Sequence, residues 1–531
     1  MVNTNIVACS CEAKADVTVN SPYSITLTNG LTVTAGNTVF KSGSSLVQIN
    51  NVTNSGNIEY DRNTQSRNTD YTYFSSPVSP QTLYNLSSLS LAGTFYSYEP
   101  TATSEDWKLE ASSNNMVAGK GYIVRGPEAS GTPTPPTTAF KVAFYGVPNN
   151  GDKSITGVFA NKSYLLGNPY PSAISADKFL SVNATYLSGT IYFWTHNTQM
   201  GIGVSNPGTG LYAYSKDDYA TYNATGGVGA APPDVGATTG PATNTGNNNN
   251  TPNGKIAAGQ GFFATSIAAG TVNFTNAMRL TGTTMPDGTG VNQQFFKKRN
   301  PKTEKVIEKN RVWLNLTNTQ GAFKQTLVGY ITGATNDYDN AFDGESFDGN
   351  EFVDFYSVNQ DKNLVIQGRA LPFDENDQVA LGFRTTINGA FTIKIDQVDG
   401  LLASQKVFIE DKLTNTVFDL KSGNYTFNTV AGTFNERFVL RYTDKTLSTA
   451  ENTVLDNQVL VSNKNKQIRV YSQAESIAKV TIYDLLGRQI YQKEKVNSAE
   501  LAITSLGVTR QTLIVKTQLQ NGQVVTKKVL Y

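Results

Sequence analysis

The sequence predicts an all-β fold: a short β-solenoid-like segment at the N-terminus, several β-sandwich domains in tandem, and an immunoglobulin-like sandwich at the C-terminus. Three observations lead to this prediction. Short runs of alternating apolar and polar residues occur along the whole chain, which is the pattern of strands with two different faces. Corners rich in Gly and Asn separate these runs at intervals of about 8–12 residues. The middle of the chain also repeats itself.

The composition is polar but carries little charge. Charged residues make up 16% of the 531 residues, against about 25% in an average soluble domain. The net charge of +1 gives no general attraction to nucleic acid or to an anionic membrane. The sequence has no apolar run of about 18 residues, so it predicts no membrane-spanning helix. Its length predicts about three or four domains.

Residues 1–66 contain short β runs with Gly-containing corners at Asn29-Gly30, Gly36-Asn37 and Ser42-Gly43. This spacing fits either the last coils of a β-solenoid or the first strands of a sandwich. The only cysteines, Cys9 and Cys11, are too close for an unstrained mutual disulfide. With His196 as the single histidine, they are too few for a zinc site. We expect them to pair with cysteines outside this sequence or to stay free.

Residues 67–160 and 161–290 are predicted to be two copies of one β-sandwich unit. Three pairs of segments match in order: 73–80 with 165–171, 93–98 with 189–194, and 118–123 with 258–263. The second copy carries an insertion, residues 224–254, rich in Gly, Thr, Ala, Pro and Asn, which predicts a surface loop.

Each copy contains a Gly-x-Gly motif, Gly119-Lys-Gly121 in the first and Gly259-Gln-Gly261 in the second. A phosphate-binding loop would need a longer glycine pattern followed by a helix, and neither copy has one. We therefore expect these glycines to let the backbone bend and to let a neighbouring strand or aromatic ring approach closely.

The rest of the chain alternates between linkers and β regions. Residues 291–310 hold the densest charge run and have no strand pattern, so they are predicted to be a linker. Eight apolar runs follow in residues 311–444 and predict a second kind of sandwich. Residues 445–456 form a second polar linker before the last predicted domain, residues 457–531.

The last domain shows seven short runs with turn signals between them, and its run at residues 512–520 alternates with period two, as in the sandwich of immunoglobulin domains. A two-residue link, Asn521-Gly522, joins its last two runs. Asn-Gly supplies the positive φ angles of a type I′ turn, so we expect a tight hairpin here.

Residues 480–490 read Val-Thr-Ile-Tyr-Asp-Leu-Leu-Gly-Arg-Gln-Ile, and residues 526–531 read Thr-Lys-Lys-Val-Leu-Tyr. With the Asn-Gly hairpin, this region resembles the C-terminal sorting domain of the type IX secretion system. The resemblance covers roughly residues 455–531. It implies that sorting and carrier binding use Tyr483, Asp484, Leu485, Leu486, Gly487, Arg488, Asn521, Gly522, Lys527, Lys528, Val529 and Tyr531.

The same resemblance implies partners and a location. In that family the domain is recognised by the outer-membrane translocon and by a carrier barrel, and a sortase-like peptidase often removes it. The Leu-Gly-Asn-Pro-Tyr-Pro-Ser-Ala-Ile block at residues 166–174 is similar to segments in surface proteins of gliding, Bacteroidota-type bacteria. We therefore expect export across the outer membrane to the cell surface. Because residues 1–12 lack the features of a secretory signal, we also expect an export signal upstream of Met1.

Catalysis has little support in the sequence, and no catalytic residues are predicted. Nucleophile–histidine chemistry would have only His196 to use. A glycosidase with two carboxylates stays open, because a sequence does not give the distance between two acids.

An acid-rich segment is a candidate calcium site. Calcium takes six to eight oxygen ligands, and loops rich in acids and glycines can wrap around it. The candidate ligands are Asp337, Asp339, Asp343, Glu345 and Asp348. The spacing differs from that of an EF-hand, and a solvated acidic loop is the alternative.

Aromatic residues beside the insertion are candidates for stacking on sugar rings, with surface glycans as partners. The expected exposed set is Tyr212, Tyr214, Tyr219 and Tyr222. The alternative is that they belong to a sandwich core, where most aromatic side chains lie.

These features together predict an exported cell-surface adhesin or binding protein that is delivered by its C-terminal domain. The alternative function is that of a carbohydrate-binding module in a larger secreted glycan-degrading protein. Calcium is the one candidate cofactor.

Overall fold

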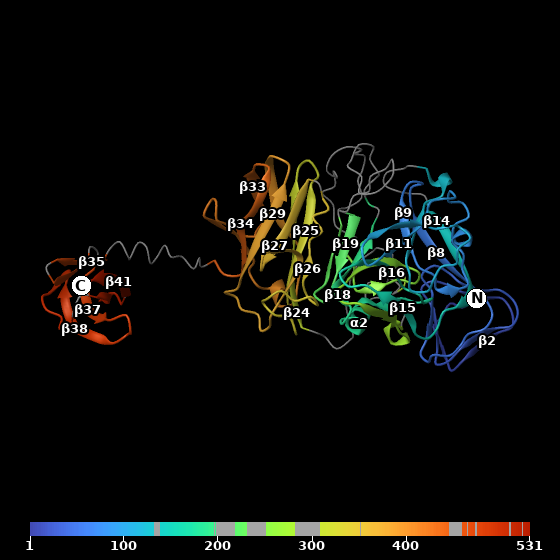
Figure 1. Ribbon diagram of the computed structural model, residues 1–531, viewed down its shortest axis with the longest axis horizontal. Helices are drawn as coiled ribbons and strands as arrows, with labels where there is room; N and C mark the ends of the chain where they lie inside the picture. The colour runs from blue at the N-terminus through green and yellow to red at the C-terminus, as the bar shows by residue number, and fades with distance from the viewer. Residues whose placement is uncertain are drawn as a thin grey trace. The chain divides into compact units, whose positions relative to one another are not determined.

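A computed structural model describes residues 1–131, 139–195, 197, 218–230, 251–281, 292, 308–350, 352–444, 459–464, 466–472, 475–508, 511–522 and 524–531. These residues form an almost wholly β protein with two short α-helices (Figure 1), which confirms the predicted fold class. The chain divides into two compact units, Met1–Asp444 and Lys445–Tyr531, which are described separately. Among the described residues, none of the helices has the length and apolar character that a membrane span requires.

The N-terminal segment is a β-solenoid, so the first of the two sequence-based alternatives is correct. Its strands pair in parallel from coil to coil, with Ile6 opposite Ile25 and Ile25 opposite Leu46. Leu27, Leu31 and Phe40 point into its core. The strands are β1 (Ile6–Ala8), β2 (Cys11–Ala13), β3 (Val17–Val19), β4 (Ser24–Leu27), β5 (Leu31–Val33), β6 (Thr38–Phe40), β7 (Ser45–Gln48) and β8 (Ile58–Gln65).

The solenoid continues directly into the first copy of the repeat. Its last strand, β8, pairs along its length with β14, so one sheet, β10-β14-β8-β6-β3, contains strands from both. The elements of the first copy are β9 (Tyr71–Phe74), β10 (Val78–Ser79), α1 (Leu83–Leu86), β11 (Phe95–Pro100), β12 (Glu105–Leu109), β13 (Tyr122–Arg125), η1 (Glu128–Ser130) and β14 (Ala139–Pro148).

The second copy has the same topology. Its main sheet runs β16-β22-β18-β19-β20, and the first four strands match, in order, β9-β13-β11-β12 of the first copy. Both helices begin at a hydroxyl cap, Thr82 for α1 and Ser175 for α2. The elements are β15 (Lys153–Val158), β16 (Ser163–Gly167), β17 (Ile174–Ser175), α2 (Ala176–Val182), β18 (Leu187–Trp194), β19 (Tyr219–Tyr222), β20 (Gly227–Val228), β21 (Lys255–Ile256), β22 (Gly261–Ser266), β23 (Gly270–Phe274) and η3 (Asn276–Met278).

The Gly-x-Gly motifs hold the two copies together in a reciprocal way. Lys120 of the first copy bridges to Leu166 of the second, and the matching Gln260 bridges to Phe74. A Cβ atom on Gly121 would lie 2.6 Å from the backbone oxygen of Leu166. The glycines therefore allow a close approach between strands, as the sequence analysis expected.

Residues 309–441 form a third sandwich from one folded-over sheet. Its strand order is β32-β31-β34-β29-β27-β28-β25-β24-β30-β33, with β26 on β28. Apolar residues of β24 and β30 pack against those of β29 and β34 in one core. The elements are β24 (Lys309–Asn318), β25 (Phe323–Ile331), β26 (Gly344–Glu345), β27 (Val353–Asn359), β28 (Lys362–Arg369), β29 (Gln378–Thr385), β30 (Gly389–Asp399), η4 (Gly400–Ala403), β31 (Phe408–Asp411), β32 (Thr416–Asp419), β33 (Tyr425–Thr429) and β34 (Gly432–Arg441).

The C-terminal unit is a small sandwich with its own apolar core. A sheet in the order β35-β36-β39 faces a second in the order β38-β37-β40-β41. The strands are β35 (Val459–Lys464), β36 (Gln467–Ser472), β37 (Ile477–Tyr483), β38 (Gln489–Ser498), β39 (Glu500–Ile503), β40 (Thr512–Leu519) and β41 (Val524–Leu530).

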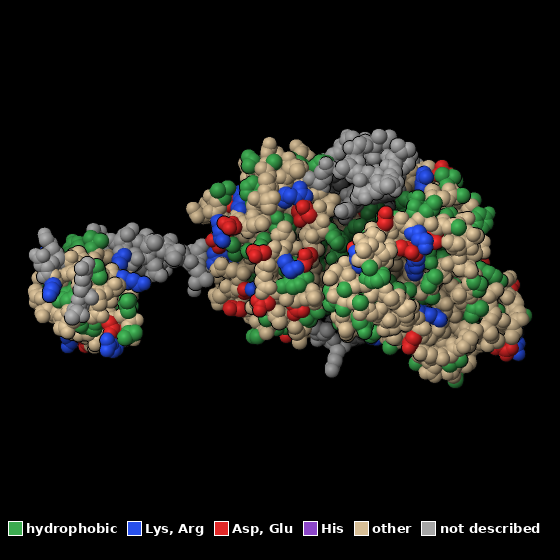
Figure 2. All heavy atoms as spheres, in the orientation of Figure 1, with side chains coloured by type: hydrophobic (Ala, Val, Ile, Leu, Met, Phe, Trp, Pro, Cys, Tyr) green, Lys and Arg blue, Asp and Glu red, His purple; other side chains and the backbone are tan. Residues whose placement is uncertain are grey.

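The surface agrees with the low charge of the sequence. On the face shown in Figure 2, uncharged polar side chains and backbone dominate, and acidic and basic side chains are interspersed. This face offers no large field of one sign that would attract a polyanion.

Candidate binding site between the second copy and the third sandwich

The acid-rich segment lies against the second copy of the repeat and is hydrogen-bonded to it. The Gly189 N–H donates to the Asn340 carbonyl (3.0 Å), and the Thr190 hydroxyl donates to the Asp343 carbonyl (3.2 Å). The Asn223 amide donates to the Phe342 carbonyl at 2.9 Å. The segment therefore supplies backbone acceptors to a neighbouring sandwich.

Basic and indole side chains of β24 complete the same contact. The Arg311 guanidinium donates to the Thr225 carbonyl at 2.9 Å and also pairs with Asp399. The Trp313 indole N–H donates to the Gly227 carbonyl at 2.8 Å. Side-chain donors of β24 thus pair with the carbonyls of Thr225 and Gly227, which holds residues 224–227 against the third sandwich.

The predicted calcium ligands do not converge on one point. Asp343 accepts from the backbone N–H groups of Asp339 (2.7 Å) and Gly368 (2.8 Å). Glu345 pairs with Lys362, and Asp348 pairs with Arg384. Asp337 accepts from Gln360, and Asp339 from the N–H of Ala341.

In the described part of the chain, no group of three acidic, histidine or cysteine side chains is placed to hold a metal ion. The residues of the acid-rich segment therefore do not fit calcium. Their oxygens are directed at separate basic, amide and backbone partners. The segment follows the contact between the second copy and the third sandwich and does not close into a loop around one centre.

Asp343 should make stability depend on pH. Burial raises the pKa of its carboxyl to about 6, from an ordinary value of 3.8, although two backbone donors oppose the rise. The folded state then binds the Asp343 proton more tightly than the unfolded state does, so protonation of Asp343 stabilises the fold. This contribution to stability is full below about pH 4 and is lost as the pH rises through about 6. We expect the thermal midpoint of wild type to fall relative to that of Asp343→Asn between pH 4.5 and 7, as measured by calorimetry. Parallel midpoints of the two proteins across that range would contradict this prediction.

The predicted sugar-binding tyrosines are less exposed than expected. Tyr212 and Tyr214 lie outside the described residues. Tyr222 is 5% exposed and its hydroxyl donates to Asp177 at 2.8 Å, so the expectation of an exposed ring is wrong for this residue. Tyr219 is partly buried, and its hydroxyl lies 2.7 Å from that of Tyr73. Both belong to β19, an inner strand of the sheet of the second copy, where neighbouring strands cover both edges.

Tyr219 is part of an aromatic cluster that the two copies share. Trp194 and Tyr219 lie opposite each other on β18 and β19, and Tyr98 and Trp107 occupy the matching places on β11 and β12. The ring centroids are 5.0 Å apart in the first pair and 5.1 Å apart in the second. Tyr73 packs against both pairs through Trp107 and Trp194. Cross-strand pairs of this kind stabilise the sheets, so most of these rings are structural.

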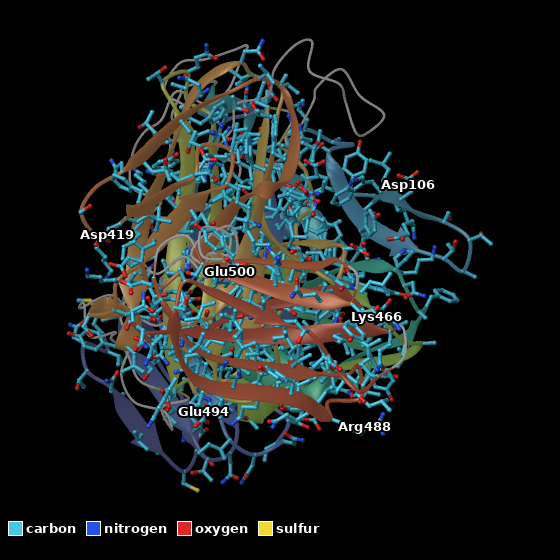
Figure 3. The ribbon with its side chains drawn as sticks, turned by 90° about the vertical axis from the view of Figure 1, so that its left-hand side faces the viewer. Asp106, Asp419, Lys466, Arg488, Glu494 and Glu500 are labelled. Atoms are coloured by element: carbon cyan, nitrogen blue, oxygen red, sulfur yellow. The ribbon has the colours of Figure 1, made fainter. Side chains whose placement is uncertain are left out.

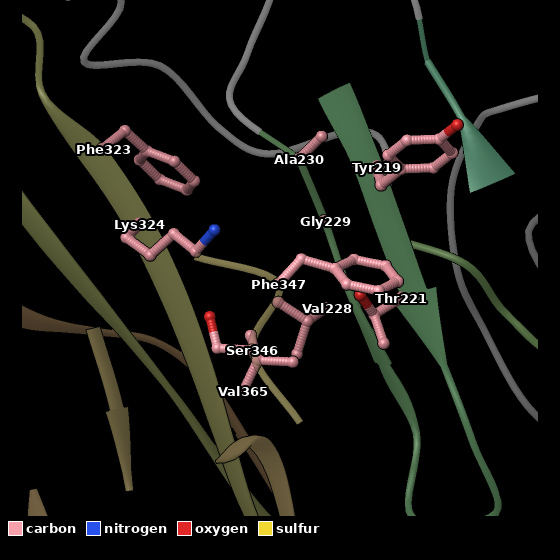
Figure 4. Close-up of a pocket in the computed structure, with 10 residues that line it drawn as sticks. All are labelled: Tyr219, Thr221, Val228, Gly229, Ala230, Phe323, Lys324, Ser346, Phe347 and Val365. Carbon is pink, nitrogen blue, oxygen red and sulfur yellow. The ribbon is translucent and has the colours of Figure 1, made fainter. Parts of the chain in front are cut away.

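A shallow pocket opens beside this cluster, between the second copy and the third sandwich (Figure 4). Its space is about 390 Å³, including the part open to solvent. Phe347 and Tyr219 lie on one side, and Lys324 directs its amine between Phe323 and Ser346. The lining residues are Tyr219, Thr221, Val228, Gly229, Ala230, Phe323, Lys324, Ser346, Phe347 and Val365.

Phe347 is the most exposed ring of the pocket, and the sequence analysis did not select it. Its side chain is 49% exposed. It packs on Tyr192 with ring centroids 4.1 Å apart, and Tyr219 lies at 6.1 Å. It is one of three phenylalanines within the acid-rich segment, with Phe342 and Phe352, and the acidic residues around it led the sequence analysis to predict a metal site.

The charges around the pocket are balanced. The Lys324 amine lies 3.8 Å from Asp354, which is 1% exposed. Burial raises the pKa of Asp354, and the positive charge of Lys324 lowers it. The Ser346 hydroxyl donates to both oxygens of Asp354, at 3.0 and 2.8 Å. The pocket therefore presents a cation next to aromatic rings without a net charge of its own.

In the C-terminal unit, the sorting residues around Asp484 form one constrained turn. The Asp484 carboxylate accepts from the N–H groups of Leu486 and Arg488, both at 2.9 Å, and from the Arg488 side chain at 2.7 Å. The hydrogen bond from the Arg488 backbone is the largest of the effects that lower the pKa of Asp484. Leu485 is 63% exposed and Leu486 is 81% exposed. Arg488 lies at the periphery of the unit (Figure 3).

The other sorting residues lie around the β40–β41 hairpin. The turn is not type I′ as expected, because Asn521 does not take a positive φ angle and only Gly522 does, at 86°. The Gly522 N–H donates to the Leu519 carbonyl, so Gln520 and Asn521 are the central residues of the turn, and the glycine follows them as in a three-residue hairpin.

Along β41, Lys528 is exposed and Lys527 is partly exposed, whereas Val529 packs in the core. Tyr531 is also a core residue and accepts from the Leu506 N–H at 3.2 Å. The residues that the resemblance selected therefore include both surface and core positions.

Comparison with protein families gives two matches. Residues 2–442 match a family described as a domain of unknown function, DUF8693. This chain belongs to that family. The DUF8693 region thus includes the solenoid, both copies of the repeat and the third sandwich. Residues 447–531 match a second domain of unknown function, DUF8694. No curated protein matches the sequence.

Two solved structures show distant similarity to this chain. The central fibronectin-III array of RIM-binding protein is 10% identical, covers 44% of this chain and 90% of its own, and has a TM-score of 0.13. The BSP domain of a biofilm-associated protein is 10% identical, covers 88% and 92%, and has a TM-score of 0.12.

Proposed function

We propose that this protein is an exported cell-surface binding protein, with residues 1–444 as an adhesive body and residues 445–531 as a type IX sorting domain. The proposed partners of the sorting domain are the outer-membrane translocon and the carrier barrel, and a sortase-like peptidase is a further candidate. The resemblance of residues 480–490 and 526–531 to such domains supports this proposal.

The observation that carries the proposal is the turn at Asp484–Arg488. Three hydrogen bonds to one carboxylate fix the backbone, yet the two leucines at the tip remain exposed. Exposing two large apolar side chains brings no folding stability, so a rigid apolar tip suits recognition by another protein. Because the tip is already in one conformation, binding loses little conformational entropy.

A second candidate is a carbohydrate-binding module of a larger secreted glycan-degrading protein. The exposed ring of Phe347 beside Lys324 favours this candidate. Both candidates assign binding to the body, and they differ in whether a catalytic domain acts with it.

A reporter fusion tests the sorting proposal. A fluorescent protein with a periplasmic export signal, fused ahead of residues 445–531, should reach the surface of a bacterium that has a working type IX system. Surface arrival is measured by loss of fluorescence when protease is added to intact cells. We expect Leu485→Ser with Leu486→Ser to reduce surface arrival severalfold, because the apolar tip is lost.

The matched control is Leu460→Ser, which removes a leucine that is 51% exposed on the other sheet. This control should reach the surface like the unmodified fusion. Retention of the unmodified fusion in the periplasm would refute the sorting proposal.

A further inference from the structure

We propose that the pocket between Phe347 and Lys324 binds one pyranose ring of an uncharged glycan. This inference rests on the proposed binding function of the body and names its ligand class. It replaces the expected tyrosine set with a site to which the second copy and the third sandwich both contribute.

Phe347 would be the stacking platform. The carbon-bound hydrogens on one face of a pyranose are weakly positive, and the face of an aromatic ring is negative, so the two attract each other. The Phe347 ring is held on Tyr192 and is still about half exposed, at 49%. Such a ring needs little ordering when a ligand binds.

The backbone conformation next to Phe347 supports a binding role for this loop. Asp348 adopts a φ of 44°, in the left-handed region that non-glycine residues seldom take. Arg384 holds it there by pairing with its carboxylate and by donating to the Asn350 carbonyl. Residues kept in sparsely populated conformations gather at binding sites, where the surrounding structure enforces them.

The polar groups of the pocket suit hydroxyls. Lys324 directs its amine toward the pocket, and Ser346 and Thr221 add oxygen atoms to the lining. Because Asp354 lies 3.8 Å from the amine, the positive charge is largely balanced. A balanced site gains little from a carboxylate or sulfate on the ligand, so an uncharged sugar is the better fit.

The size of the site also points to a small ring. Stable protein–protein interfaces bury roughly 1,600 Å² in total, whereas this depression is lined by ten residues with a single strongly exposed ring. A sugar ring places apolar and hydroxyl surfaces within that span. An aromatic ring beside a few placed polar groups is the usual composition of a small-ligand site.

The test is an array of defined neutral and acidic oligosaccharides probed with the full chain, residues 1–531. The neutral oligosaccharide that binds most strongly is then titrated by calorimetry against wild type and variants. Phe347→Ala should weaken its binding by about tenfold or more, since stacking and ring burial are lost. Lys324→Met should weaken binding by a similar factor of about tenfold, and Phe347→Trp should retain it.

The matched control is Tyr145→Ala, which removes a ring that is 58% exposed in the first copy and should leave binding unchanged. Thermal unfolding of each variant excludes loss of the fold as the cause. An empty array, binding confined to acidic sugars, or equal affinity of Phe347→Ala and wild type would each overturn the proposal. Surface arrival of the reporter fusion is measured separately, so an empty array leaves the sorting proposal standing.

Discussion

Replacing Arg279 by methionine is expected to lower the free energy of unfolding of the Met1–Asp444 unit by about 3 kcal/mol. Arg279 is 5% exposed and lies at the end of the second copy. Its guanidinium stacks over Tyr170, with 4.9 Å from its central carbon to the ring centroid. The change should be read from urea unfolding followed by tryptophan fluorescence.

The large effect follows from the number of acceptors that this side chain serves. The guanidinium donates to the Leu46 carbonyl of the solenoid (2.5 Å), to Asn150 of the first copy (3.0 Å), and to Ser172 (3.1 Å) and Asn276 (3.3 Å) of the second. Methionine fills similar space but donates nothing, so buried or partly buried oxygens from three parts of the chain lose a partner.

The described partners of Arg279 are uncharged, so removal of the buried charge offsets part of the loss of its hydrogen bonds. Desolvation lowers the pKa of Arg279 to about 9, and the group is still charged at neutral pH. Arg279→Lys should be intermediate, because an amine keeps the charge but cannot reach all of these acceptors. Lys108→Met, at a side chain that is 54% exposed, should change stability by less than about 1 kcal/mol. A cost below that level for Arg279→Met would refute the role of this side chain in joining the three parts.

Replacing Gly121 by alanine is expected to cost about 3 kcal/mol, because the added methyl group overpacks the contact between the two copies. Its Cβ would lie 2.6 Å from the Leu166 carbonyl oxygen and 2.6 Å from the Leu165 side chain. The carbonyl belongs to a paired strand, so it cannot move away without breaking the sheet. Equilibrium unfolding of the full chain in urea measures the loss.

The reciprocal glycine gives a graded comparison. A Cβ on Gly261 would lie 3.0 Å from the Tyr73 Cβ, so Gly261→Ala should destabilise less than Gly121→Ala. Gly423→Ala is the control, because the nearest atom to its Cβ would be at 3.7 Å, an ordinary contact. Equal effects of Gly121→Ala and Gly423→Ala would show that the close approach does not limit stability.

The sequence did not predict the positions of the acid-rich segment and of the aromatic residues correctly, because these depend on contacts between distant segments that a sequence does not show. Seven acidic residues between 337 and 354 predicted a shared ligand set, but the candidate ligands Asp337, Asp339, Asp343, Glu345 and Asp348 each have separate partners. Tyr222 was expected at the surface because it borders a polar insertion. It is buried because its strand lies inside the sheet of the second copy.

The sequence by itself determined the strands, the repeat and the close approach at the Gly-x-Gly motifs. Alternation, turn residues and glycine act over a few neighbouring positions, so local sequence is enough to specify them. Only the tertiary structure decided that the N-terminal coils stack as a solenoid, that Arg279 is buried, and that Phe347 faces a pocket with Lys324. Each of these depends on segments tens to hundreds of residues apart, and their pairing is set by packing and hydrogen bonding that leave no periodic pattern in the chain.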